Sequence, residues 1–210
     1  MNKLKEFNNV IGGMPYFLPE NLLSLGFERR YLNISLSRLK KRGDIIPLKR
    51  GIYVSVEYLD KVKRNGEYSK YLEMISGVLY SPSYLSLEYV LNEYNILSES
   101  SFSFSLVSTK KTFEIKNDLG LFRYRNIKES LFTGFNLIKS GDFLIYKATK
   151  AKALFDFLYF RKNIITGDDF LESFRVNKEM LSDSDLKEFK KYVSISNNQK
   201  MKEIAKFYEH

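Results

Sequence analysis

Glycine and proline residues divide the first 55 positions into short segments, which limits what this part of the chain can fold into. Gly12 and Gly13 follow a stretch with helical spacing of apolar residues, and glycine directly after such a stretch is a usual stop signal. Pro19 and Gly26 bracket a second stretch, and proline suits a first helical turn. A third periodic stretch ends at Gly43. The pattern predicts three short helices in place of one long element.

The third predicted helix, over residues 28–42, has a narrow apolar stripe. Leu32, Leu36 and Leu39 fall at i, i+4 and i+7, and this spacing predicts the buried side of a helix. The residues predicted on the opposite side and its flanks are mostly polar or basic: Arg30, Asn33, Ile34, Ser37, Arg38 and Lys41.

Two short extended segments follow, at residues 44–48 and 51–54, with Lys49 and Arg50 at the turn between them. Pro47 cannot donate to a strand ladder, so we expect its strand at a sheet edge. Three short helices followed by a hairpin with a basic tip are typical of a winged helix-turn-helix. In that fold the third helix enters the DNA major groove and the hairpin approaches the DNA backbone.

Positive charge is concentrated at this end of the chain. The net charge is +9 overall, and residues 1–70 hold 14 basic and 7 acidic side chains, a net of +7. Residues 71–210 hold 20 and 18, a net of +2. Five of the ten arginines lie within residues 29–50. An AT-rich genome raises lysine content but does not cluster arginine, so the distribution predicts a polyanionic partner.

Eight residues of the third helix and the hairpin are the predicted contacts with double-stranded DNA. Arg30, Asn33 and Ser37 are predicted to read base edges, because arginine suits guanine, asparagine suits adenine and serine suits either. Basic side chains nearby are predicted to hold phosphates, which fix position and supply most of the affinity. The full set is Arg29, Arg30, Asn33, Ser37, Arg38, Lys41, Lys49 and Arg50.

The rest of the chain predicts a second, mixed domain. A polar stretch near residues 60–66 predicts a linker, so we expect a winged-helix domain over 1–65 and a second domain over 66–210. Helices are predicted near 68–80, 86–94 and 149–160. Phe102, Phe104 and Leu106 alternate with serines and predict a half-buried strand, and a hairpin is predicted around residues 117–120. The expected fold class is α+β, with a small antiparallel sheet and helices in the second domain.

Composition excludes several kinds of chemistry. The chain has no cysteine and one histidine, His210, which excludes zinc fingers, thiolate nucleophiles and histidine-based triads. We expect no cofactor and no metal. No apolar run approaches about 20 residues, and Glu6, Asn8 and Asn9 interrupt the place where a signal peptide would be apolar. These features predict a soluble, cytoplasmic protein that does not contact a membrane.

One short motif leaves an enzymatic alternative open. Glu114, Ile115 and Lys116 match the E-x-K element of a metal-dependent nuclease. Such a site needs a second carboxylate to hold the metal ion. The nearest upstream acids, Glu93 and Glu99, do not stand in a suitable context. We therefore expect no enzymatic activity and keep the nuclease as a minor alternative.

Three segments resemble motifs of one protein family, in the same order and with the same spacing. Residues 36–43 and 48–53 (LSRLKKRG and LKRGIY) resemble a winged helix that ends in an "rGvY" turn. Residues 84–91 (YLSLEYVL) resemble "YvSleSAL", and residues 152–159 (KALFDFLY) resemble "KALlDllY". These are motifs of the AbiEi-type antitoxins of bacterial type IV toxin–antitoxin systems, and the resemblance covers about residues 15–165.

The resemblance implies a transcriptional regulator that represses its own operon by binding the operator. It also implies that the C-terminal domain counteracts a nucleotidyltransferase-like toxin in abortive infection, a form of phage defence, without requiring a stable complex. Lys152 and Asp156 would belong to the antitoxin surface; their i, i+4 spacing alone predicts a surface ion pair. The main alternative is a winged-helix regulator whose second domain senses a small ligand.

Overall fold

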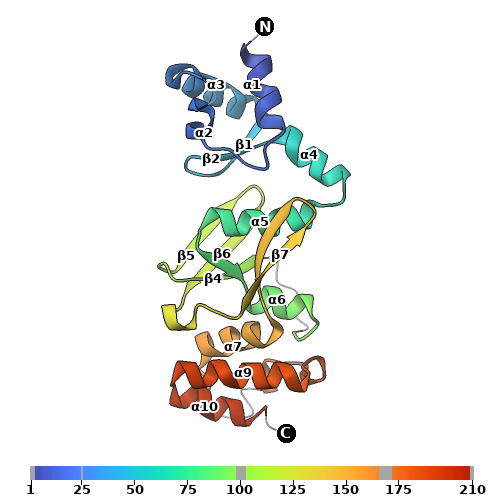
Figure 1. The fold of residues 1–210 in the computed structure, drawn as a ribbon, viewed down its shortest axis with the longest axis vertical. Helices are drawn as coiled ribbons and strands as arrows, with labels where there is room; N and C mark the ends of the chain where they lie inside the picture. Colours follow the sequence, from blue (N-terminus) through green and yellow to red (C-terminus); the bar gives the residue numbers. More distant parts are fainter. Residues whose placement is uncertain (1–2, 25, 98–102, 166–171, 209–210) are drawn as a thin grey trace. The chain divides into compact units, whose positions relative to one another are not determined.

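The computed structural model describes residues 3–24, 26–97, 103–165 and 172–208. The fold is α+β, with N-terminal helices and a two-stranded hairpin followed by a six-stranded mixed sheet with helices (Figure 1). The chain divides into two compact units, Met1–Leu72 with Ile115–Leu119, and Glu73–Glu114 with Gly120–His210. The division at residue 72 falls inside helix α5 (Tyr68–Leu79) and not at a linker.

The first unit contains the three short helices that the sequence predicts, α1 (Lys3–Gly12), α2 (Pro19–Leu23) and α3 (Arg29–Arg42). Pro19 is the first residue of α2. Gly43 ends α3 in the left-handed conformation at φ 77°, which a side chain would strain. The core of this unit is made of apolar residues from the helices and the hairpin: Phe7, Ile11, Phe17, Leu22, Leu32, Leu36, Leu39 and Ile45.

The hairpin is formed by β1 (Ile45–Lys49) and β2 (Ile52–Ser55), which pair antiparallel. On its other side β2 bonds to Phe17, since Phe17 N donates to Tyr53 O at 2.8 Å and Tyr53 N donates to Phe17 O at 3.0 Å. Strand β1 therefore lies at the edge, which confirms the position predicted from Pro47.

The segment near residues 60–66 that was predicted as a linker is mostly helical in the structure. Helix α4 (Val56–Arg64) begins at Ser55, whose side chain accepts a hydrogen bond from Tyr58 N at 3.1 Å. Tyr58, Leu59 and Val62 are buried. Charged residues between these positions give the segment its polar composition, although one face of the helix packs in the core.

The six-stranded sheet has the order β5-β6-β4-β3-β8-β7. Pairing is parallel between β4 and β6 and between β3 and β8, and antiparallel between β3 and β4 and between β7 and β8. The expectation of a small antiparallel sheet is therefore wrong: the sheet is larger and mixed. Its strands are β3 (Ser83–Leu85), β4 (Ser103–Ser108), β5 (Phe113–Asn117), β6 (Gly120–Asn126), β7 (Phe135–Ser140) and β8 (Phe143–Ala148).

Strand β4 differs from its prediction as a half-buried strand. Ser103 and Ser105 are only 7% and 5% exposed, whereas Phe104 between them is partly buried, so the serine side of the strand is buried as well. The reason is position, since β4 is an interior strand between β6 and β3, and five of its six residues are buried. Phe102 lies outside the described residues.

Helices cover the sheet of the second unit (Figure 1). The predictions near 68–80, 86–94 and 149–160 are confirmed by α5, α6 (Leu87–Glu93) and α7 (Lys150–Arg161). Helix α7 packs against α6 and against α9 (Asp183–Ser196), which contacts α10 (Gln199–Lys206). Two single 3-10 turns cover Glu129–Leu131 and Lys178–Met180. Within the described ranges, no helix has both the length and the apolar character needed to cross a membrane.

Candidate nucleic-acid interface

Helix α3 separates its apolar and polar residues as the sequence predicts. Leu32, Leu36 and Leu39 are buried, and Ser35 is buried beside them. All six predicted contacts on this helix are exposed: Arg29, Arg30, Asn33, Ser37, Arg38 and Lys41. The helix therefore presents a long polar and basic face to solvent.

The basic side chains of this face are available to an external partner. Arg29, Arg30, Arg38 and Lys41 make no ion pair with any residue in the part of the chain that the structure describes. Arg42 differs, because its Nε lies 3.0 Å from Asp44 Oδ2. Unpaired cations that share one helix repel one another unless a polyanion neutralises them.

The hairpin adds two more predicted contacts. Arg50 occupies the turn between β1 and β2 and is exposed, while Gly51 beside it has φ 81° and allows the turn to be tight. Lys49 ends β1 and is partly buried. Helix α3 and the hairpin tip thus carry all eight predicted contact residues within the first unit.

Ile34 is an exposed apolar residue on the polar face of α3. It is 45% exposed on α3, among the polar side chains. A large aliphatic side chain left in water within a polar face can pack against an apolar group of a partner. The exposure of Ile34 could have been predicted from the sequence, because Ile34 lies outside the leucine stripe of the helix.

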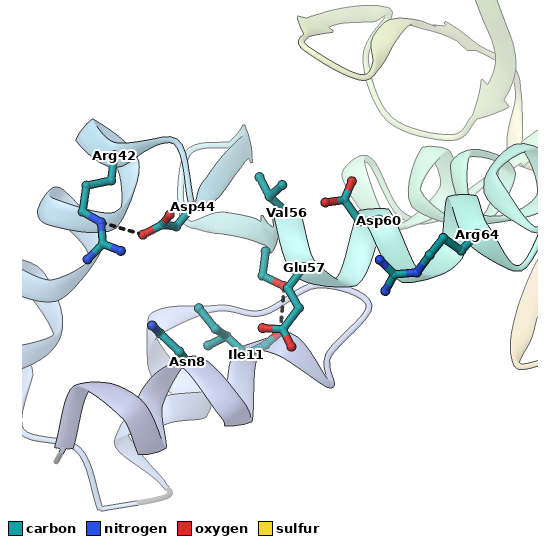
Figure 2. Close-up of a pocket in the computed structure, with 9 residues that line it drawn as sticks. Asn8, Ile11, Arg42, Asp44, Val56, Glu57, Asp60 and Arg64 are labelled. Carbon is teal, nitrogen blue, oxygen red and sulfur yellow. Dashed lines mark hydrogen bonds and ion pairs between the residues drawn. The ribbon is translucent and has the colours of Figure 1, made fainter.

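A cavity of about 390 Å³ lies in the first unit, lined by residues of α1, α4, the last residue of α3 and both ends of the hairpin (Figure 2). Its charged lining residues are Asp44, Glu57 and Asp60 against Arg42 and Arg64, a net charge of −1. Figure 2 shows Arg42 turned toward Asp44. This surface does not favour phosphate, so the basic charge of the unit is not spread evenly.

Lys152 and Asp156 do not lie on the surface, so the prediction of an exposed pair is wrong. Both side chains are 0% exposed, and Lys152 Nζ lies 2.6 Å from Asp156 Oδ1. The other carboxylate oxygen accepts hydrogen bonds from Tyr84 Oη at 2.9 Å and Ser86 Oγ at 2.8 Å. The pair joins α7 to strand β3 and the residue that follows it, and it cannot contact a partner directly in this conformation.

Aromatic rings surround the ammonium group of this pair. Lys152 Nζ lies 4.8 Å from the ring centre of Phe155 and 5.3 Å from that of Tyr192. Gly134 has φ 78°, and a Cβ there would fall 3.0 Å from Lys152 Cγ and closer still to Tyr192. Burial raises the pKa of Asp156, against the opposing effects of Lys152 and of the hydrogen bonds.

A second buried charged cluster was not predicted from the sequence. Lys147 on β8 is 3% exposed, and its Nζ lies 3.0 Å from Glu73 Oε2 and 2.7 Å from Glu93 Oε2. Tyr89 Oη donates to Glu73 Oε1 at 2.9 Å. The burial of Lys147 could have been predicted from the sequence, because Lys147 alternates in step with Phe143 and Ile145 and so lies on the same, buried face of the strand. The cluster ties α5 and α6 to β8.

Glu114 of the nuclease-like motif takes part in a simple surface ion pair. Its Oε2 accepts from Arg123 Nε at 3.0 Å, and both side chains are more than half exposed. Among residues 3–24, 26–97, 103–165 and 172–208, no three acidic or histidine side chains are grouped so that they could hold a metal ion.

Comparison of the sequence with models of protein families gives no match, and comparison with curated proteins gives none either.

Proposed function

We propose that the chain is a winged helix-turn-helix protein that binds the operator of its own operon and represses it, and that its second unit acts as an antitoxin. The toxin would be a nucleotidyltransferase-like protein encoded beside it. This is the type IV toxin–antitoxin arrangement of abortive infection. The proposal includes no enzymatic step and no cofactor, and both activities belong to the cytoplasm.

The observation that carries the DNA-binding part is the basic face of the first unit. Four of the basic residues predicted as contacts on helix α3, and Arg50 at the hairpin turn, form no ion pair within the described residues. In a major groove, Arg30, Asn33 and Ser37 would meet base edges. The methyl group of thymine suits Ile34, which is 45% exposed. The remaining basic side chains, Lys49 included, would contact phosphates.

The antitoxin part is supported by the sequence resemblance of residues 84–91 and 152–159. Residues 71–210 carry a net charge of only +2, so this part is not built mainly to hold a polyanion. Lys152 and Asp156 would serve it indirectly, by fixing α7 against the sheet. Protection in such systems need not involve a stable complex with the toxin.

The experiment measures two activities of the full chain in cells. A reporter gene behind the promoter of its own operon records repression, and survival after induction of the neighbouring nucleotidyltransferase-like protein records protection. Reversing charge with Arg38→Glu and Arg50→Glu together should abolish repression and leave protection intact. Lys61→Glu, an exposed change of the same kind on α4, should leave both activities unchanged.

Two results would contradict the proposal. Full repression by the Arg38→Glu, Arg50→Glu chain would show that α3 and the hairpin do not bind the operator. Absence of any such neighbouring gene, or failure of the full chain to protect, would remove the antitoxin part and favour a regulator that senses a small ligand.

A further inference from the structure

A cavity of about 700 Å³ lies within the second unit, and neither DNA binding nor the buried ion pairs use it. Strands β4 and β6 provide one side, and the start of α6 and the end of α7 provide another. Cavities of roughly 300–1,000 Å³ are the usual size of small-molecule sites.

The strand side of the cavity is polar because of the strand register. Ser105 of β4 pairs with Arg123 of the parallel strand β6, and the lining also includes Ser103 and Arg125, each two residues away. Residues two apart on a strand share a face, so two serines and two arginines form one polar strip. Tyr124, which lies between the two arginines, points to the opposite face and is buried.

The basic residues that line this cavity are arginines, although lysines are more common in this part of the chain. Residues 71–210 contain 4 arginines and 16 lysines. Three of the arginines, Arg123, Arg125 and Arg161, line the cavity, whereas no lysine is among its described lining residues. Arginine presents a planar fork that matches phosphate and carboxylate oxygens, which the ammonium group of lysine does not.

The three arginines differ in the ion pairs and hydrogen bonds that they already form within the chain. Arg161 pairs with Glu88, and its guanidinium carbon lies 3.9 Å from the ring centre of Phe157. Arg123 Nε bonds to Glu114, and its NH1 donates to Ser103 Oγ at 3.4 Å. Arg125 has no ion-pair partner within the described ranges. With Glu88 included, the lining carries a net charge of +2.

The other side of the cavity is apolar. Its lining residues there include Leu87, Leu97, Phe160, Ile164 and Phe174. Leu87 has a left-handed φ of 58°, a conformation that costs free energy in a residue with a side chain and that clusters at ligand sites. An occupant that fits both sides must be anionic at one end and flat and apolar at the other.

We propose that this cavity binds a nucleoside phosphate, with Arg123 and Arg125 holding the phosphate group and the aromatic and aliphatic side chains packing on the base. The serines of β4 lie where a ribose hydroxyl or a phosphate oxygen can bond to them. The nucleotide could be free or could be the end of a single strand, and the two sources share this chemistry.

Calorimetric titration of the full chain tests the proposal. The probes are ATP, CTP, AMP and CMP, the corresponding nucleosides, inorganic phosphate, and a short single-stranded RNA with a 5′ phosphate. We expect at least one nucleotide or the RNA end to bind at least about tenfold more tightly than its nucleoside and than phosphate. Preference for the free nucleotide or for the RNA identifies the source.

Variants place the binding in this cavity. Arg125→Gln should weaken binding at least about tenfold, because it removes a charge-assisted hydrogen bond, and Arg125→Lys should restore only part of it. Lys187→Gln, an exposed residue of α9 with the same change of charge, should have no effect. The Arg38→Glu, Arg50→Glu chain should bind the nucleotide normally, which excludes binding at the basic face of the first unit.

Any of three results overturns the proposal. They are no binding by any nucleotide probe, equal binding of nucleotide and inorganic phosphate, and undiminished binding by an Arg125→Gln chain whose circular dichroism and thermal unfolding match the wild type.

Discussion

The side chains of Lys152 and Asp156 are removed from water together, and each depends on the other. Their charges lie 2.6 Å apart, and Tyr84 and Ser86 satisfy the remaining carboxylate oxygen. Removing one member of a buried pair leaves an uncompensated charge in a medium of low polarity, which costs about 3–5 kcal/mol. The pair therefore specifies how α7 docks on β3.

We predict that Lys152→Met lowers the free energy of unfolding by about 3–5 kcal/mol, measured by urea denaturation followed by circular dichroism. Adding Asp156→Leu to that variant should recover much of the loss, because no buried charge then remains. Lys187→Met at the surface should change stability by less than about 0.5 kcal/mol. Equal effects of the two lysine substitutions would contradict the buried pair.

At this scale the sequence predicted exposure correctly on α3 but not on α7. An i, i+4 pair of opposite charges has the same spacing in water and in a core, so spacing alone could not distinguish them. The neighbouring residues could have distinguished the two cases. Apart from Lys152 and Asp156, residues 151–158 are apolar on all sides of the helix, and such a helix is typically buried, as residues 151–158 are here. The burial of Lys147 could also have been predicted, because it lies on the same face of β8 as the apolar residues Phe143 and Ile145.

Individual elements were predictable where local signals mark their ends. Pro19, Gly43 and Thr149 mark helix ends that the structure confirms. Helix α4 was missed because charged residues alternate with its buried ones. Strands β3 and β7 were missed for different reasons: β3 has three residues, and β7 is exposed along most of its length. Such strands are defined by their partners and not by their own periodicity.

Helix α4 can be distinguished from a linker by paired substitutions at adjacent positions. Leu59 is buried and Asp60 is exposed. Leu59→Ala should cost about 2–5 kcal/mol, as truncation of a core leucine does, whereas Asp60→Ala should cost less than about 0.5 kcal/mol. The measurement is the urea midpoint of each variant. A linker would tolerate both changes equally.

At the scale of the whole molecule, the order of the sheet could not have been predicted. Parallel pairing of β4 with β6, and of β3 with β8, joins segments that are distant along the chain. No turn motif encodes such pairing. The change in net charge near residue 70 falls close to the division of the chain, but the continuous helix α5 that crosses this division could not be predicted from the charge.

Buried tyrosines are spread through the molecule, and they predict how it responds to alkali. Burial raises the pKa of Tyr71, Tyr84, Tyr89, Tyr124 and Tyr208 well above the usual value of about 10. Each of these side chains holds its proton more tightly in the folded chain than in the unfolded chain. Their contribution to stability is therefore complete below about pH 10 and is lost as the pH rises toward the folded pKa.

We predict that a fraction of the 15 tyrosines ionises only when the protein unfolds. Near-ultraviolet absorbance of tyrosinate should rise in two stages, the second coinciding with loss of the circular dichroism signal. The absence of tryptophan keeps this absorbance free of interference. Complete ionisation near pH 10 with native circular dichroism would show that these side chains are not buried.

The central claim is that α3 and the hairpin bind DNA, and fluorescence anisotropy of the full chain with its own promoter duplex tests it most directly. With about 4–6 phosphates contacted, the slope of log affinity against log salt should be roughly −4 to −5. Lys49→Glu or Arg50→Glu should weaken promoter and scrambled duplexes equally, whereas Asn33→Ala or Ser37→Ala should reduce only the preference for the promoter. Binding that is insensitive to salt, or that survives Arg50→Glu unchanged, would contradict the account.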